Sequence, residues 1–301
     1  GDAGLERITI GTGVAAAAIT TATTALNIDA SAAANALAIT GNAGNNILIG
    51  SAYNDILDGA AGLDAMDGAG GSDLYLISSS LHHSAAEISD SGSGDGDSDE
   101  LRFTSTTANQ TLTIFATETG LERITIGTGV AATAISTATT ALNIDAGAAA
   151  NALTISGNNG ANRLKGSAYD DILIGNGGND ILAGGAGNDT LSGGAGADIF
   201  RFDSSLNSLS NVDQLTDFNP SESDRIQLEN SIFTALPTTG TLAATAFYVG
   251  GAALTSAHRI LFNPITSTLL YDPDGSNPLA ATAFATVTPG LTLSNLQFVV
   301  T

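Results

Sequence analysis

The sequence predicts an all-β protein in which parallel β-solenoid blocks follow irregular, β-helix-like rungs, with a β-rich cap at the C-terminal end. Three features of the 301 residues support this fold class. A glycine-rich motif recurs every nine residues in two blocks, a segment of 37 residues is duplicated 116 residues further on, and residues 203–301 lack the motif. Fixed periods of this kind are typical of stacked, solenoid-like architectures.

The duplicated segment covers residues 4–40 and 120–156, and five of its 37 positions differ between the copies. In the first copy, the runs LERITI, ALNIDA and ALAIT alternate apolar and polar residues, which favours short β-strands. Residues 14–25 are rich in alanine, which favours a helix, but also in threonine, which disfavours one. Irregular solenoid rungs are therefore predicted there, with a short helix as the alternative. Long duplications are typical of arrays, so we expect the array to continue upstream of Gly1.

Each copy leads into nonapeptides of the form G-G-x-G-x-D-x-U-x, in which U is a large apolar residue. Six residues suffice for a turn and three for a short strand, and glycine permits close backbone approach in the turn. Two nonapeptides then complete one coil of a parallel β-roll, so residues 18 apart stack on the same edge. The nonapeptides start at Gly41, Gly50, Gly59 and Gly68, and again at Gly157, Gly166, Gly175, Gly184 and Gly193. The apolar residues expected to point inward are Leu48, Leu57, Met66, Tyr75 or its neighbour, Leu164, Leu173, Leu182, Leu191 and Phe200.

The sixth position of the motif stacks carboxylates into ladders. Carboxylates at strand spacing, about 4.8 Å, repel one another, and a hard cation between them converts this repulsion into binding. Ca²⁺ accepts six to eight oxygens at flexible angles, including backbone carbonyls, whereas Mg²⁺ demands a tighter octahedron. We therefore expect roughly four to seven Ca²⁺ ions. The expected pairs are Asp55 with Asp73, Asp171 with Asp189 and Asp180 with Asp198, and the weaker terminal rungs are Asn46 with Asp64 and Asn162 with Asp180.

Residues after each block are candidates to close its last site. Glu87 and Asp90 follow the first block, and Asp217 is the best candidate after the second, ahead of Asp213 and Asp224. A flexible Gly/Asp linker is the alternative to a roll, but the apolar residue stays in phase throughout. The complete set of candidate calcium ligands is Asp55, Asp64, Asp73, Asp171, Asp180, Asp189, Asp198, Asn46, Asn162, Asp217, Glu87 and Asp90.

The nonapeptides resemble those of RTX (repeat-in-toxin) exoproteins of Gram-negative bacteria. VDQLTDFNPSESDRIQL at residues 212–228, RILFNPITSTLLYDPDGSN at 259–277 and the final LTLSNLQFVVT are similar to the region that follows the last roll in such proteins. The resemblance implies a calcium β-roll and secretion by a type I ABC exporter through an uncleaved C-terminal signal. The first block departs from the pattern, since Leu63, Ala65 and Met66 replace the usual residues.

These features divide the chain into six expected segments. In chain order they are solenoid repeat A at 1–40, roll 1 at 41–77, an acidic loop with connecting strands at 78–119, solenoid repeat B at 120–156, roll 2 at 157–202, and the cap with the secretion domain at 203–301.

Composition excludes several classes of function. Eight Lys and Arg against 30 Asp and Glu give a net charge of −22, which argues against nucleic acid and anionic membrane surfaces as partners. No run approaches the roughly 18 apolar residues of a membrane span, and residues 1–10 lack the features of a signal peptide. With no cysteine there are no disulfides or thiolate metal sites, and three histidines are too few for most catalytic or zinc schemes.

Several shorter motifs have ordinary interpretations. ITIGTGVAA at residues 8–16 imitates a dinucleotide-binding turn, but no further βαβ units follow it. DGDSDE at 95–100 is expected to be a solvated acidic loop, and DPDG at 272–275 a plain turn. The pair His82 and His83 is expected in an exposed loop, and His258 in a strand with its hydrogen bonds satisfied.

Two functions from different classes are compatible with the sequence. The first is a secreted calcium-binding structural protein of the cell surface or extracellular matrix, such as an S-layer, adhesin or fibre subunit that self-associates into oligomers, sheets or filaments. The second is the C-terminal secretion and folding module of an RTX enzyme or toxin. We expect no catalysis within the chain, because it contains neither G-x-S-x-G nor H-E-x-x-H.

Overall fold

The computed structural model describes residues 6–11, 21–85, 87–92, 96–129, 134 and 136–301. The chain forms two compact units, Gly1–Asn158 and Asn159–Thr301. Within the described ranges, no helix is long and apolar enough to cross a membrane. The helices there are four single 3-10 turns: η1 (Ser80–His82), η2 (Pro220–Glu222), η3 (Ala244–Ala246) and η4 (Asn295–Gln297). The predicted all-β class is confirmed, while the finer segment boundaries stay predictions.

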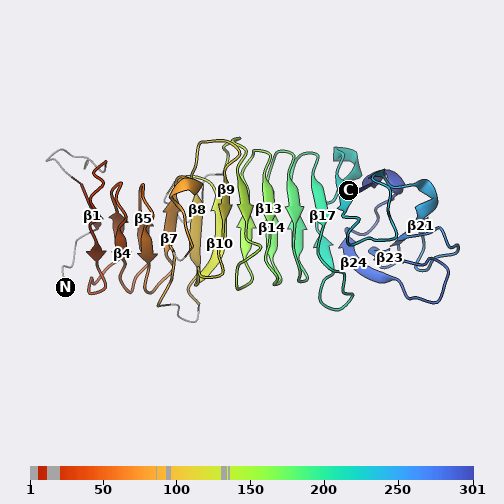
Figure 1. Ribbon diagram of the computed structural model, residues 1–301, viewed down its shortest axis with the longest axis horizontal. Coiled ribbons are helices and arrows are strands. Elements are labelled where there is room, and N and C mark those ends of the chain that lie inside the picture. The colour runs from red at the N-terminus through yellow and green to blue at the C-terminus, as the bar shows by residue number, and fades with distance from the viewer. Residues whose placement is uncertain (1–5, 12–20, 86, 93–95, 130–133, 135) are drawn as a thin grey trace. The chain divides into compact units, whose positions relative to one another are not determined.

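Unit 1 is a parallel solenoid whose short strands alternate between sheets (Figure 1). The pairing is parallel between neighbouring strands of each sheet, as the roll requires. One sheet runs in the order β1 (Arg7–Thr9), β3 (Ala38–Thr40), β5 (Ile56–Asp58), β7 (Leu74–Ile77), β8 (Asp99–Phe103), β10 (Leu121–Ile126) and β12 (Thr154–Ser156). The other strands are β2 (Ile28–Asp29), β4 (Ile47–Ile49) and β6 (Ala65–Asp67), which pair together, and β9 (Thr111–Thr113) with β11 (Asn143–Asp145).

The strand register confirms the predicted coil of two nonapeptides. Ile56 pairs with Leu74, 18 residues further on, and Ile47 pairs with Ala65 at the same interval. The central residue of each three-residue strand points inward because side chains alternate along a strand. The coil that precedes each block contains more residues than a coil of the roll, and its length is the same in both copies. Arg7 pairs with Ala38 in the first copy, and Arg123 pairs with Thr154 in the second. All predicted inward residues, Leu48, Leu57, Met66, Tyr75, Leu164, Leu173, Leu182, Leu191 and Phe200, are at most 1% exposed.

Unit 2 combines the same parallel arrangement with a β-rich cap (Figure 1). Later strands extend the parallel sheets of the roll, and the cap adds antiparallel pairs and one further parallel pair, β21 with β22. One sheet runs β14 (Ile172–Ile174), β16 (Thr190–Ser192), β18 (Asp213–Leu215), β24 (Thr282–Val287), β23 (Thr268–Tyr271), β22 (Ile260–Asn263), β21 (Phe247–Val249). The other runs β13 (Arg163–Lys165), β15 (Ile181–Ala183), β17 (Ile199–Phe202), β19 (Arg225–Leu228), β25 (Phe298–Val300), β20 (Gly240–Thr241).

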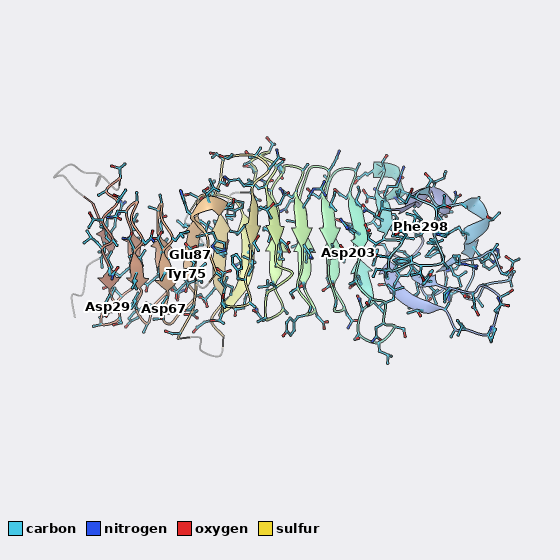
Figure 2. The ribbon with its side chains drawn as sticks, viewed as in Figure 1. Asp29, Asp67, Tyr75, Glu87, Asp203 and Phe298 are labelled. Atoms are coloured by element: carbon cyan, nitrogen blue, oxygen red, sulfur yellow. The ribbon has the colours of Figure 1, made fainter. Side chains whose placement is uncertain are left out.

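Aromatic side chains fill the core of the cap. Phe233 packs edge-on against Phe284 and Tyr271, with ring centroids 5.3 and 5.1 Å apart. Phe298, labelled in Figure 2, is fully buried and lies 5.4 Å from the ring of Phe247. Edge-on aromatic pairs are favourable beyond the area that they bury. The cap therefore has a hydrophobic core of its own, in addition to the stacked apolar side chains inside the roll.

The segment between the blocks differs from its prediction. A solvated loop was expected for residues 78–100, but Ile88 is fully buried and bridges to Met66 as a further rung. The prediction of a solvated loop at 95–100 is also wrong for the end of that run. Asp99 and Glu100 are 1% and 5% exposed and begin β8. The solenoid continues through this segment because apolar residues still recur at its strand positions, although the nine-residue spacing is lost.

Histidine environments also correct the sequence interpretation. The imidazole of His83 is buried, with Nδ1 2.9 Å from Glu87 and Nε2 3.3 Å from Glu118. It is not in an exposed loop, because two buried carboxylates need a cationic partner. His258 lies outside any strand, where it accepts from the Leu254 amide and stacks on Tyr248 at 4.6 Å. The helix considered for residues 14–25 falls largely outside the described residues, and 21–25 are not helical.

Candidate metal centre

The sixth-position carboxylates form the predicted ladders. In each step, Oδ1 of one aspartate accepts the backbone N–H of its counterpart one coil earlier. Asp73 accepts from Asp55 at 2.6 Å, and Asp198 accepts from Asp180 at 2.8 Å. The remaining steps are Asp171 N–H to Asp189 at 2.8 Å, Asn46 N–H to Asp64 at 2.7 Å and Asn162 N–H to Asp180 at 2.7 Å. The predicted stacking is confirmed, while the role of each residue as a calcium ligand stays a prediction.

The ladders extend beyond the nonapeptides. Sequence reasoning missed Asp99 and Glu122, and it named Asp213 and Asp224 only behind Asp217. Asp73 N–H donates to Asp99 at 2.6 Å, and Asp99 N–H donates to Glu122 at 2.8 Å. After the second block, Asp213 and Asp224 accept from the amides of Asp189 and Asp198 at 3.2 and 2.9 Å. The sequence signal for these residues is an acid at or next to the start of a strand, because the nine-residue spacing has ended.

Two of the proposed closing residues have other partners. Asp217 accepts from the Gly193 and Gly194 amides at 2.9 and 2.8 Å and from the Ser192 hydroxyl at 2.6 Å. It therefore caps the turn, and the ladder positions fall to Asp213 and Asp224 instead. Glu87 forms the buried pair with His83 described above, and Oε2 also accepts from the Ser84 amide. Both carboxylates are satisfied by protein donors, which a purely local spacing argument could not show.

Two kinds of turn occur in the blocks, and the backbone at the second position distinguishes them. In the turns that begin GSAY, the second-position N–H donates back to the outer oxygen of the turn's own aspartate. Ser51 caps Asp55 and Ser167 caps Asp171, each at 2.5 Å. A positive φ occurs at the second position of five further turns, at Ala60, Ala69, Asn176, Gly185 and Gly194. The turn that starts at Gly41 has no positive φ there, and its Asn42 N–H donates to Asn46 Oδ1 at 2.8 Å. We call the first kind capped turns and the second kind open turns.

The open turns leave carboxylate oxygens bare. Among the described residues, Oδ2 is buried without a hydrogen-bond partner at Asp73, Asp180, Asp189 and Asp198. The first-position glycine makes room for this oxygen, since a Cβ on Gly68 or Gly184 would overlap it. Buried carboxylate oxygens without a partner are costly and rare in folded proteins. Four of the five open turns therefore present a buried acceptor that a cation could satisfy, and Asp64 in the Ala60 turn is the exception.

Burial raises the pKa of the ladder carboxylates. The pKa of Asp180 and Asp189 rises to about 7 and that of Asp73 to about 8, because desolvation disfavours the charged form. Nearby carboxylates add to the rise, as Asp198 does for Asp180. A bound cation would reverse this effect by favouring the ionised form. Protons and cations therefore compete for the same oxygens.

The donor set fits calcium. No three His, Asp or Glu groups among the described residues converge into a cluster that could hold a metal by side chains alone. The turns supply main-chain oxygens in addition: a Cβ on Gly50 or Gly41 would come 2.5 or 2.6 Å from the carbonyl oxygen of Gly68 or Gly59, one coil away. Carboxylate and carbonyl oxygens in a flexible arrangement match the preference of Ca²⁺.

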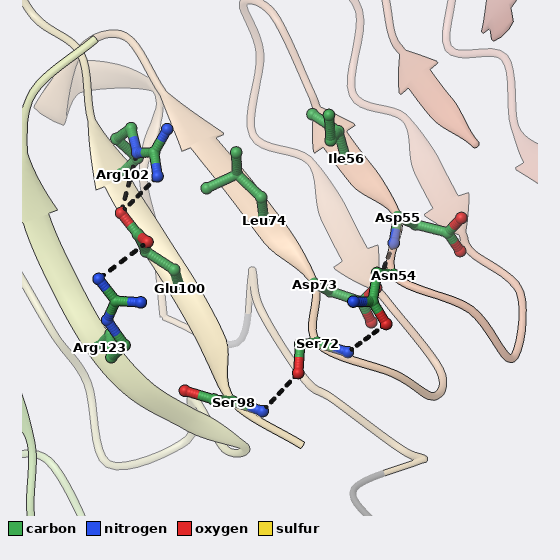
Figure 3. A pocket seen from close by; sticks show the side chains of 10 residues that line it. All are labelled: Asn54, Asp55, Ile56, Ser72, Asp73, Leu74, Ser98, Glu100, Arg102 and Arg123. Atoms are coloured by element: carbon green, nitrogen blue, oxygen red, sulfur yellow. Dashed lines mark hydrogen bonds and ion pairs between the residues drawn. The ribbon is translucent and has the colours of Figure 1, made fainter. Parts of the chain in front are cut away.

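A cavity of about 380 Å³ lies beside Asp55 and Asp73 (Figure 3). Its far wall is Glu100, held by Arg102 at 2.8 Å and Arg123 at 3.5 Å. Figure 3 shows the two arginines on either side of Glu100. Although Glu100 is adjacent to Asp99 in sequence, its carboxylate is neutralised by arginine and does not join the ladder.

A parallel β-roll with ladders of stacked carboxylates and bare inward oxygens is the architecture of a calcium-binding repeat protein. The family model of the RTX calcium-binding nonapeptide repeat, in four copies, matches residues 40–75, 156–191 and 174–204. The chain thus contains RTX nonapeptide repeats, and these repeats bind calcium. No curated protein matches the chain. The C-terminal secretion domain expected from the resemblance lies beyond the matched residues and stays a prediction.

Proposed function

We propose that this protein is a secreted structural component of the bacterial cell surface or extracellular matrix, of the S-layer, adhesin or fibre type. It is not an enzyme; calcium folds and stiffens it outside the cell. The observation that carries the proposal is the duplicated unit. Both copies of the 37-residue segment form the same long rung, from Arg7 to Ala38 and from Arg123 to Thr154, before entering a roll. Repeated stacking adds length, which serves fibres and lattices.

Charge and calcium together support folding after export. At −22, the calcium-free chain repels itself, which favours an extended state suited to passage through a type I ABC exporter. Extracellular calcium then neutralises the ladders and stabilises the roll by mass action. The nonapeptide family of the repeats supports this route, since it is typical of proteins exported by Gram-negative bacteria.

The edge of the solenoid supports self-association. Among the described strands, β1 pairs with β3 and with no other, so its second edge presents backbone groups to a further strand. Calcium lowers the repulsion between copies, and a head-to-tail contact of this kind propagates into filaments or sheets.

Light scattering and electron microscopy in millimolar calcium test the proposal. We expect ordered oligomers, sheets or filaments that dissolve in EGTA. A strictly monomeric species over a wide range of concentration, in the full-length protein as well as in this chain, would contradict it. The alternative function, a secretion and folding module of an enzyme or toxin, predicts a calcium-loaded monomer joined to a catalytic domain upstream.

A further inference from the structure

The turn that follows the first block departs from the nonapeptide pattern at one telling position. Ile88 bridges to Met66, and Ser89 N–H donates to the Met66 carbonyl at 3.1 Å. This register places Asp90 in the column that Gly68 occupies one coil earlier. On the other side, Asp90 N–H donates to the Thr119 carbonyl at 3.1 Å, and a Cβ on Gly120 would meet Asp90. Asp90 thus replaces the first-position glycine of a turn that ends at Asp99.

The side chain at this position must enter the turn. In the repeats, a Cβ on the first-position glycine would point at Oδ2 of the turn's own sixth-position aspartate, as it does from Gly68 toward Asp73. In the Asp90 turn, the corresponding ladder residue is Asp99, whose Oδ1 accepts from the Asp73 amide. The Asp90 and Asp99 carboxyl groups accordingly lie within hydrogen-bonding reach of each other.

These two carboxyl groups are buried with few hydrogen-bond donors, and the Asp73 amide is the donor to Asp99. Asp90 is 7% exposed and Asp99 is 1% exposed. Neither oxygen of Asp90 has a hydrogen-bond partner of normal geometry among the described residues. Burial raises the pKa of both groups, that of Asp99 to about 7, and the charged groups that add to the rise are acidic, namely Asp67 and Asp97 for Asp90 and Glu122 for Asp99. Such a pair needs a counter-charge inside the turn.

We propose that Asp90 and Asp99 form a calcium site of their own, outside the nonapeptide repeats. The repeats combine one aspartate per turn with main-chain oxygens, whereas this turn supplies two carboxylates from one turn. Asp99 also follows Asp90 by nine positions, whereas Asp73 follows Gly68 by five. The family match ends at residue 75, before this turn begins. Two carboxylates with turn carbonyls suit Ca²⁺, and Mg²⁺ would be a poor substitute.

The test counts ions on the whole chain. Native mass spectrometry in calcium compares the wild type with D90N, which keeps the shape of the side chain and removes its charge. The matched control is D29N, an exposed acid of unit 1 labelled in Figure 2 whose Oδ1 bonds to Ser31. We expect D90N to bind one ion fewer than the wild type and D29N to bind the full number. An unchanged count for D90N would show that the pair holds a proton instead and would overturn the site.

The melting temperature in saturating calcium gives a second, independent readout. Without a cation in the turn, neutralising one of two facing buried carboxylates relieves repulsion, so D90N would melt higher than the wild type. With a cation there, D90N loses a ligand and melts lower, and failure to fold is the extreme of the same result. D90E, which retains the charge, should recover the ion. A higher melting temperature for D90N in calcium therefore rejects the proposal.

Discussion

Replacing Asp180 by asparagine separates the structural and the calcium-binding roles of a ladder carboxylate. Oδ1 of Asp180 accepts the Asn162 amide at 2.7 Å, and Oδ2 is buried and bare. Asparagine keeps the first interaction and removes the charge. The chain already accepts an amide in this column, since Asn46 donates through Nδ2 to the Leu26 carbonyl at 2.7 Å. We therefore expect D180N to fold in the same register with one calcium site disabled.

The magnitude follows from linkage between calcium binding and folding. Each bound ion adds about 1.4 kcal/mol to the free energy of unfolding per tenfold rise in calcium above its Kd. Between about 0.1 and 10 mM calcium, D180N should therefore gain about 2.7 kcal/mol less than the wild type. At low calcium the difference in the free energy of unfolding between the wild type and D180N should become small or change sign. The rise in the pKa of Asp180 to about 7 implies a cost of about 4 kcal/mol for the ionised group, which solvent screening at the turn reduces to about 2 kcal/mol.

Urea unfolding followed by circular dichroism at a series of calcium concentrations measures both effects. The matched control is D170N in the same roll. Asp170 is exposed and accepts the Asn188 amide at 2.7 Å, as Asn179 does for Ala197 at 3.0 Å, so asparagine is already used in that column. D170N should show the wild-type calcium dependence. The same dependence in D180N would refute the assignment of Asp180 as a ligand.

The remaining predictions concern calcium removal, turn type and pH. EGTA at pH 8 should abolish most β signal from residues 157–202 in circular dichroism, and an unchanged spectrum would contradict this. Native mass spectrometry should show that D189N loses one ion while D171N loses none, because Ser167 caps Asp171 and Oδ2 of Asp189 is bare; equal losses would remove the distinction between capped and open turns. In EGTA, stability should fall as pH rises. The folded pKa of Asp180 and Asp189 is about 7 and that of Asp73 about 8, against 3.8 unfolded, so the stability from bound protons is full below about pH 3.8 and lost through pH 7 to 8. Circular dichroism in EGTA should accordingly recover at pH 5, and a weaker signal there than at pH 8 would contradict the sign. Burial works against charge on His83, but hydrogen bonds that its ring donates to Glu118 and Glu87 outweigh it and raise its pKa to about 9. Its contribution, about 3 kcal/mol, is full below pH 6.5 and lost as pH passes 9, so H83Q should cost more in urea unfolding at pH 6 than at pH 9.5.

The nine-residue period was sufficient to predict the roll, its coil and its ladders. Glycine, aspartate and an apolar residue recur in phase, so a turn, a stacked carboxylate and an inward side chain must recur in phase as well. The burial of Leu57 and Leu182 and the hydrogen bond from Asp55 to Asp73 follow from that period alone. In the same way, the absence of cysteine and the small number of basic residues limited the metal chemistry to hard cations held by oxygen.

Where the period ends, sequence spacing no longer indicates which acid continues a ladder. Asp99 and Glu122 take these positions because strand β8 pairs with β7 and strand β10 pairs with β8. Asp217 caps a turn because it follows strand β18 closely and accepts the Gly193 amide. His83 is buried because the chain brings Glu87 and Glu118 together from segments 31 residues apart.

By itself, the sequence determined the repeating coil, the chemistry of the ladders and the choice of calcium, since these depend on residue type and interval. The tertiary structure decided which carboxylates keep a bare oxygen. Asp171 and Asp189 occupy the same position of the motif, yet the backbone turns the Ser167 amide toward the first, while Gly185, with φ near 108°, leaves the second uncapped. That difference lies in the direction of one N–H, which the stacking of each turn on its neighbours sets and residue spacing does not.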